Sequence, residues 1–218
     1  VLVSAALSFS AAVRNFSHRA LGWKPAGLFT GVMQIPFDHF KTDPDKAGHI
    51  RALLDKLGRI PGVDRASISE MVPLYGWPTQ KRIVIEGAAP LPSGQEPLAF
   101  LSAVDGGFVT TLKIPLKEGR FLPDTFTERD SLGVVINETM AKLYWPGQSA
   151  IGKRVKVAGE EKWNEVIGVV GDVTMPINFS TPASRLQIYC GLQQQLGIWY
   201  NFVLKSDLPP NALIKPVR

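Results

Sequence analysis

The sequence predicts an α+β fold, in which strands and short helices are mixed without a long regular alternation. Short apolar or alternating runs of strand length recur along the chain, and one longer segment carries an apolar stripe at helical spacing. With 218 residues, of which 45% are hydrophobic and 20% charged, the chain has the composition of a folded globular protein. This length allows one large domain or two small lobes that share a core.

The first half of the chain begins with a strand over Leu28–Ile35, ended by Pro36. Asp43-Pro44-Asp45 then starts a helix that runs to about Ile60, with Pro in the first turn and acids at the positive end of the helix dipole. Its apolar stripe consists of Ile50, Leu53, Leu54 and Leu57. Beyond Pro61-Gly62 we expect strands over Val63–Ser69, Val84–Glu86 and Leu98–Val104, a loop over Ala88–Pro97, and a short helix over Gly107–Leu112.

The second half has the clearest local signals. Asn137 is a good N-cap for a helix over Glu138–Trp145, with Glu138 and Lys142 paired one turn apart. Gly168 and Gly171 lie inside an apolar strand, where glycine permits a bulge or close packing. We expect strands over Gly133–Ile136, Arg154–Val157, Glu165–Val173, Leu186–Leu192 and Tyr200–Lys205. The alternation in Leu186–Leu192 predicts a half-buried strand.

Both ends of the chain are read as fragments of longer helices. Val1–Val13 is uncharged and shorter than the roughly 20 apolar residues that span a membrane. It is either the last turns of a transmembrane helix or an ordinary buried helix. The residues favour neither interpretation over the other. The bases that follow, from Arg14 to Lys24, are typical of a cytoplasmic flank and leave the orientation open. Asn211–Arg218 reads as the first turns of a helix.

Charge argues against nucleic acid as a partner. Lys and Arg number 24 against 19 Asp and Glu, a net charge of +5, but phosphate binding needs a contiguous basic face. The densest groups, Lys81-Arg82 and Lys153-Arg154-Val155-Lys156, lie in strand-like segments with acids nearby. They are read as solvated sheet edges and faces. The single cysteine, Cys190, excludes an internal disulfide and any cysteine-based zinc site.

One stretch has the spacing of a phosphate-binding loop. Gly147-Gln148-Ser149-Ala150-Ile151-Gly152-Lys153 matches G-x-x-x-x-G-K. A P-loop needs a strand before it, a helix after it, and Ser or Thr following the Lys. Here a helix precedes, a strand follows, and Arg154 replaces the hydroxyl, so nucleotide binding is not predicted.

No residue is predicted to carry catalysis. The group Asp38, His39, Asp43, Asp45 and His49 fits neither an H-E-x-x-H helix nor a calcium-binding EF-hand loop, and helix capping accounts for it better than a metal. No G-x-S-x-G elbow occurs, and Cys190 lies within a strand. We therefore predict no enzyme, no catalytic, cofactor-binding or metal residues and no cofactor. The residues that contact substrate or partner stay unknown.

The middle of the chain resembles a known family. Val135-Ile136-Asn137-Glu138, Tyr144-Trp145-Pro146-Gly147, Ile151-Gly152-Lys153-Arg154 and Val166–Val173 (VIGVVGDV) are similar to the "VNE…YWPG…(P)IGKR…VIGVVGDV" string of MacB-like periplasmic core domains. These domains belong to ABC-transporter permeases of the MacB/FtsX/LolC type. Weaker matches follow the family order from about Leu21. Ala150 in place of the usual Pro, and Cys190-Gly191 within a "VYVPL" strand, are departures.

The resemblance implies a two-lobed domain. Residues 1–20 would be the end of a truncated transmembrane helix or stalk. Residues 21–96 and 183–218 would form a membrane-proximal βαβ-type lobe, and 97–182 an inserted mixed α+β lobe. The domain would lie outside the cytoplasm, in the periplasm, as part of an inner-membrane permease.

Partners and function follow from the same resemblance. The partners would be a cytoplasmic ABC ATPase, absent from this chain, a permease dimer mate, and a periplasmic adaptor or outer-membrane protein. The permease would export macrolide, peptide or lipoprotein cargo, or transmit the ATPase stroke mechanically to envelope partners.

Two other functions stay open from the residues alone. A ligand-sensing ectodomain of a membrane signalling protein would show a pocket with convergent polar groups. A hydrolase would bring two perturbed acids face to face in a cleft.

Overall fold

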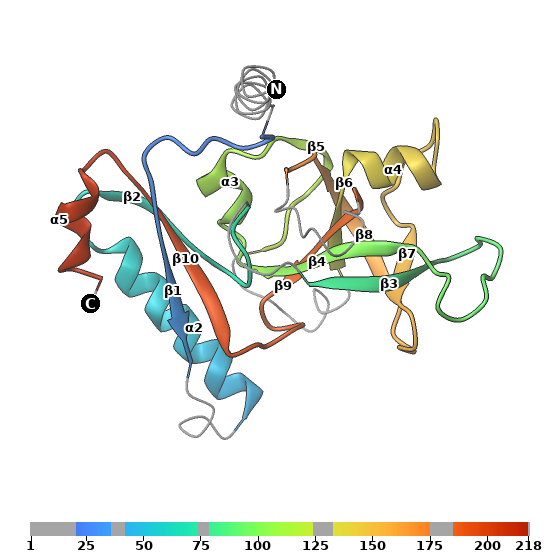
Figure 1. The fold of residues 1–218 in the computed structure, drawn as a ribbon, viewed down its shortest axis with the longest axis horizontal. Helices are drawn as coiled ribbons and strands as arrows, with labels where there is room; N and C mark the ends of the chain where they lie inside the picture. Colours follow the sequence, from blue (N-terminus) through green and yellow to red (C-terminus); the bar gives the residue numbers. More distant parts are fainter. Residues whose placement is uncertain (1–20, 36–41, 74–78, 124–132, 175–184, 218) are drawn as a thin grey trace, which may run out of the picture.

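The computed structural model describes residues 21–35, 42–73, 79–123, 133–174 and 185–217 (Figure 1). Within these residues, ten strands belong to one sheet and four helices flank it. The strands are β1 (Leu28–Gln34), β2 (Val63–Ser69), β3 (Gln80–Ile85), β4 (Leu98–Val104), β5 (Leu116–Gly119), β6 (Gly133–Asn137), β7 (Arg154–Val157), β8 (Asn164–Val170), β9 (Gln187–Gly191) and β10 (Trp199–Ser206). The helices are α2 (Asp43–Gly58), α3 (Phe108–Leu112), α4 (Glu138–Tyr144) and α5 (Pro210–Ile214).

Strands β1, β2 and β10 and helix α2 form a split βαβ unit. Strand β10 lies between β1 and β2 and is antiparallel to both, so β1 and β2 run in the same direction with α2 as their connection. Figure 1 shows this unit on the left, beside α5 and the end of the chain. Helix α2 packs on one face of the unit, and α3 packs against β2 and β10 on the other.

Helix α2 begins as the sequence predicts, with one addition. Pro44 lies in the first turn, and the cap residue is Thr42, which the sequence reading did not single out. The Thr42 hydroxyl accepts from the Asp45 backbone N–H at 3.3 Å, and the Asp45 carboxylate accepts from the Thr42 N–H at 3.2 Å. This is a capping box. Of the predicted stripe, Ile50 and Leu57 are buried and Leu53 and Leu54 pack against the same core.

Six other strands pair in a closed ring. The order is β4–β3–β7–β8–β6–β9, and β9 returns to β4 in parallel. A single pair of residues, Ser69 and Val104, joins β2 of the split unit to β4 of the ring. Strand β5 pairs with β8 outside this circuit.

Alternate residues along the ring strands face two different cores. Ile83, Ala103, Ile136, Val166 and Ile188 belong to a core that also receives Met140 from α4 and Trp145 from the residue that follows it. Phe100, Val135, Val170 and Tyr189, one position out of step, belong to a second core with α3. Because successive side chains on a strand point to opposite faces, the first set lines the inside of the ring.

Most predicted elements are confirmed within two residues. Strand β8 ends at Val170, three residues before the predicted Val173, and α5 ends at Ile214 although a helix was predicted over Asn211–Arg218. Three further predictions need correction. Strand β3 is longer than predicted, since it begins at Gln80 rather than Val84. Strand β5 was not predicted, and all four of its residues are exposed. Strand β9 was predicted to be half-buried, yet all five of its residues are buried because it pairs with β4 and β6 and has a core on each face.

The division into two lobes stays a prediction. In this structure β3 and β9, which the predicted boundaries place in the membrane-proximal lobe, pair with strands of the ring. At the end of the chain, α5 spans Pro210–Ile214 and buries Leu213. Among the described residues, no helix has the length and apolar character needed to cross a membrane. The segment 1–20, read as the end of a transmembrane helix, lies outside the described residues.

Candidate functional site

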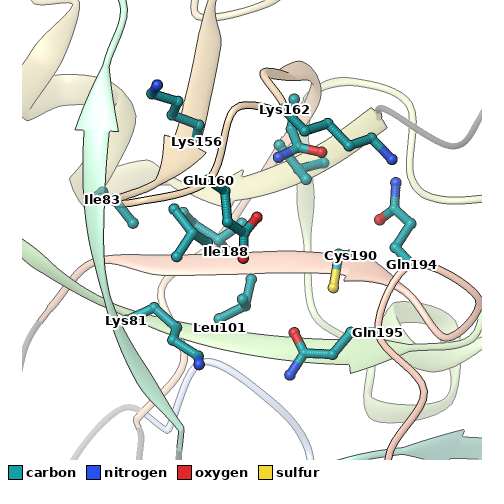
Figure 2. A pocket seen from close by; sticks show the side chains of 13 residues that line it. Lys81, Ile83, Leu101, Lys156, Glu160, Lys162, Ile188, Cys190, Gln194 and Gln195 are labelled. Carbon is teal, nitrogen blue, oxygen red and sulfur yellow. The ribbon is translucent and has the colours of Figure 1, made fainter.

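A cavity of about 320 Å³ opens at one end of the ring (Figure 2). All six ring strands contribute to its wall, which is closed further by the β7–β8 loop and by the turn after β9. The lining residues are Lys81, Ile83, Leu101, Val134, Lys156, Val157, Glu160, Lys162, Asn164, Ile188, Cys190, Gln194 and Gln195. Mouths of small barrels are common places for ligands.

The floor of the cavity is apolar. Ile83, Val134 and Ile188 are buried, and Leu101 packs beside them. Cys190 completes the floor, and burial, reinforced by the negative charge of Glu70, raises the pKa of its thiol to about 12. The thiol is therefore neutral at physiological pH and acts as a small apolar group rather than a nucleophile.

The rim carries charges of both signs. Three lysines come from β3, β7 and the β7–β8 loop, and Glu160 comes from the same loop. The Lys156 ammonium lies 5.0 Å from the centroid of the Trp163 ring, so its charge is held by the indole. In Figure 2 the Glu160 carboxylate points into the cavity toward Ile188, with Lys81 and Gln195 on the facing side.

Two glutamines and a half-buried acid support this wall. Gln194 accepts from the Gly191 N–H at 2.9 Å and donates to the Gly133 carbonyl at 3.1 Å, which ties the turn after β9 to β6. Gln195 donates to Glu70 at 3.4 Å. Burial raises the pKa of Glu70, while the Ala103 N–H, Gln195 and the charge of Lys81 oppose that rise.

The sequence did not identify this cavity. Lys81 and Lys156, from the two basic groups read as solvated strand faces, come to one rim because β3 pairs with β7. The lining residues come from six strands, and they have no regular spacing in the sequence that would predict a cavity. A pocket with convergent polar groups is the feature expected of a ligand-sensing domain, and this cavity lies at one end of the ring.

A second polar cluster joins two of the four sequence strings that carry the family resemblance, the first and the last. The Asn137 amide donates to Asp172 at 2.6 Å and to the Arg185 carbonyl at 2.8 Å, and its oxygen accepts from the Met140 and Gln187 N–H groups. Asp172 also accepts from the Thr139 N–H and hydroxyl, at 3.0 and 2.6 Å. We call these residues, Asn137, Thr139 and Asp172, the junction. It ties α4 and β6 to the chain after β8 and before β9.

Residues 21–24, where the described part of the chain begins, are held beside the junction. We call them the chain entry. The Thr174 N–H donates to the Leu21 carbonyl at 2.9 Å, and the Lys24 N–H donates to the Leu112 carbonyl at 2.9 Å. Gly22 has φ +76°, and a Cβ there would lie 1.8 Å from the Asp172 carbonyl oxygen. Only glycine fits such a position, so the first described residues are held tightly against the end of β8.

The loop with P-loop spacing is a turn, as predicted. Helix α4 ends before it and β7 follows it, while Gly147 and Gly152 adopt φ of +71° and +79°. Of the five acidic and histidine residues between positions 38 and 49 that could suggest a metal site, Asp38 and His39 lie outside the described residues. Asp45 serves in the capping box of α2, as capping predicts. Among the described residues, no group of three or more potential metal ligands comes together.

Comparison with known proteins decides the family. Residues 2–208 match the model of the MacB-like periplasmic core domain. The chain belongs to this family. No functionally curated protein is significantly similar to it.

Two solved structures are similar to this domain. The periplasmic region of MacB from Actinobacillus actinomycetemcomitans superposes with a TM-score of 0.57 at 15% identity, over 90% of this chain and 82% of that one. The extracellular domain of the noncanonic ABC-type transporter YknZ from Gram-positive bacteria gives a TM-score of 0.49 at 17% identity, over 87% and 88%. The first of these confirms the mixed α+β fold of MacB periplasmic domains.

The family resemblance drawn from the sequence is therefore confirmed. This MacB-like domain is a periplasmic domain of the ABC-transporter permease type.

Proposed function

We propose that this MacB-like domain passes the movement of a membrane helix, driven by a cytoplasmic ATPase, to a partner or cargo outside the cytoplasm. It acts in an inner-membrane permease dimer with a periplasmic adaptor or outer-membrane protein. The cargo class is a macrolide, peptide or lipoprotein. No chemical step takes place in the domain itself.

The observation that carries this proposal is the fastening of the chain entry to the ring. Residues 21–24 bond through their backbone to Thr174 and Leu112, and Gly22 packs against the Asp172 carbonyl. The junction then connects that point to α4, β6 and β9. Because backbone contacts are stiff, a displacement at residue 21 reaches the ring directly through Thr174 and Asp172, in parallel with the connection to the split βαβ unit through α3 and β1.

Gly22→Ala tests the proposal in the full-length permease with its ATPase. The added Cβ meets a backbone carbonyl and enforces strain at positive φ, so it pushes the entry away from the ring. We expect ATP hydrolysis to continue while transport falls about tenfold or more. Gly94→Ala is the matched control, because Gly94 has φ +88° but nothing lies within 4 Å of the added Cβ.

Two results would contradict the proposal. Transport by Gly22→Ala equal to that of Gly94→Ala would show that the entry contact passes no movement. Parallel loss of hydrolysis and transport in a correctly assembled variant would place the defect in the ATPase cycle. Thermal unfolding of both variants separates either result from misfolding.

A ligand-sensing role is the second candidate, and the ring cavity favours it. The cavity has an apolar floor and polar groups that converge on it from several strands. Such a site is compatible with membership of the permease family if the ligand biases the position of the ring.

A further inference from the structure

The charges around the ring cavity restrict what it can hold. A purely anionic ligand would meet the Glu160 carboxylate, which points into the cavity (Figure 2). A purely cationic ligand would meet a rim with three lysines. Since like charges at close range oppose binding, the lining favours a ligand that carries both signs at separate ends.

One acid and one lysine face each other across the cavity. Glu160 belongs to the β7–β8 loop, whereas Lys81 belongs to β3 and lies with the Gln195 amide on the facing side. Glu70 lies behind Gln195 and interacts with Lys81, which keeps the lysine on that wall. The other two lysines lie on the Glu160 side of the cavity. Lys156 belongs to β7, where the Trp163 ring holds its charge, and Lys162 belongs to the same loop as Glu160.

The space between these walls is apolar and small. Ile83, Leu101 and Ile188 form its floor with the neutral Cys190 thiol. About 320 Å³ corresponds to roughly ten water molecules at ~30 Å³ each. That volume accommodates an amino acid or dipeptide and excludes a folded peptide segment.

We propose that the ring cavity binds a small zwitterion with an apolar side chain, either a free amino acid or a dipeptide. The ligand's ammonium group bonds to Glu160, its carboxylate bonds to Lys81 and Gln195, and its side chain rests on the floor formed by Ile83, Leu101 and Ile188. This inference stands apart from the proposed transmission of movement, because it rests only on the cavity.

Calorimetric titration of the 218-residue chain with matched ligands tests the charge requirement. The probes are leucyl-leucine, its N-acetyl derivative and its C-terminal amide, which present the same side chains as a zwitterion, an anion and a cation. We expect the zwitterion to bind about tenfold more tightly than either blocked form, the value of one charge-assisted hydrogen bond. Free leucine, titrated in parallel, distinguishes an amino acid from a dipeptide as the ligand.

Two variants assign each end of the ligand. In Glu160→Gln the zwitterion should lose its advantage over the N-acetyl derivative and keep its advantage over the amide. In Lys81→Gln the pattern should reverse. The controls are Glu161→Gln, on the same loop but outside the lining, and Lys215→Gln, an exposed lysine beyond α5.

The proposal is overturned if neither leucine nor leucyl-leucine binds at millimolar concentration. It is equally overturned if the blocked forms bind as well as the zwitterion, or if the controls alter binding as much as the rim variants do. None of these results bears on the transport defect expected of Gly22→Ala, so the two proposals fail independently.

Discussion

The split βαβ unit and the six-stranded ring satisfy their buried polar side chains in different ways. In the split unit most buried polar side chains donate to backbone carbonyls: Ser69 to Met71 at 2.8 Å, Ser206 to Gly62 at 2.6 Å and Asn201 to Glu70 at 2.8 Å. Ser67 is the exception among these, since it donates to the Asp105 carboxylate. In the ring, Asn137 makes four hydrogen bonds to four different residues. The split unit is thus held mainly by its ladders, and the ring is also held by side-chain links between strands.

This difference in hydrogen bonding predicts which region of the domain tolerates substitutions better. A strand ladder adjusts when one side chain is altered, because its backbone bonds remain. A ring closed by pairing and by a shared polar cluster has no free end through which to relax. We therefore expect comparable substitutions to cost more in the ring than in the split unit.

Glycines in the two regions give the largest expected contrast. A Cβ at Gly168 in β8 would lie 2.0 Å from the Arg120 carbonyl oxygen, whereas one at Gly31 in β1 would lie 2.3 Å from the Phe202 ring. Since a carbonyl in a ladder cannot move aside but a phenyl ring can rotate, Gly168→Ala should lower the free energy of unfolding by about 3 kcal/mol and Gly31→Ala by about 1 kcal/mol. Urea unfolding measures both. Equal losses would refute the contrast.

Substitution of the two buried asparagines, Asn137 in the ring and Asn201 in the split unit, tests the same contrast in stability. Asn137→Ala leaves the Asp172 carboxylate and the Gln187 N–H without one partner each and should cost about 2–3 kcal/mol. Asn201→Ala removes one bond to a carbonyl and should cost about 1 kcal/mol. The same urea series gives both values. A larger loss for Asn201→Ala would mean that the junction is not what links the ring strands.

Glu70 lies where the two regions meet and gives the smallest effect. It accepts from the Ala103 N–H of β4 at 3.2 Å, and burial raises its pKa above the ordinary 4.5. The folded state therefore binds this proton more tightly than the unfolded state does. Stability should fall as pH rises from about 4.5 through the raised pKa.

Glu70→Gln should flatten this part of the stability profile. Thermal unfolding midpoints between pH 4 and pH 8 provide the measurement, with Glu161→Gln as an exposed control. A profile of Glu70→Gln that keeps the wild-type slope would assign the pH dependence to another group.

Local signals made much of the ring predictable. Asn137 bonds the Met140 N–H and starts α4 as a cap residue should, and the Glu138–Lys142 ion pair is present at 3.0 Å. The expected close packing at Gly168 is also found, where a register shift occurs between β6 and β8. Each of these features depends on residues near one another in sequence, which is why the pattern records them.

Features built from distant segments were not predictable. Strand β5 has four exposed residues and pairs with one neighbour, so it lacks the apolar alternation of a half-buried strand. Gln187 and Tyr189 look like the solvent side of β9, but Tyr189 donates to Gln187 at 3.1 Å and Gln187 accepts from the Val173 N–H, both within the interior. The cavity exists because six strands pair into a closed ring. The periodicity of one sequence predicts individual strands but not which strands pair to close a ring.

The position of β10 has a consequence for the order of events during folding. It is the last strand in the sequence and the middle strand of the split βαβ unit. Until it arrives, β1 and β2 have no partner in that unit and α2 has only part of a surface to cover. The split unit can therefore be completed only after residues 199–206 have been synthesised. Contacts between segments this far apart in the sequence slow folding. The two open edges of β1 and β2 therefore stay exposed while the residues of the ring, which lie between β2 and β10 in the sequence, are added to the chain.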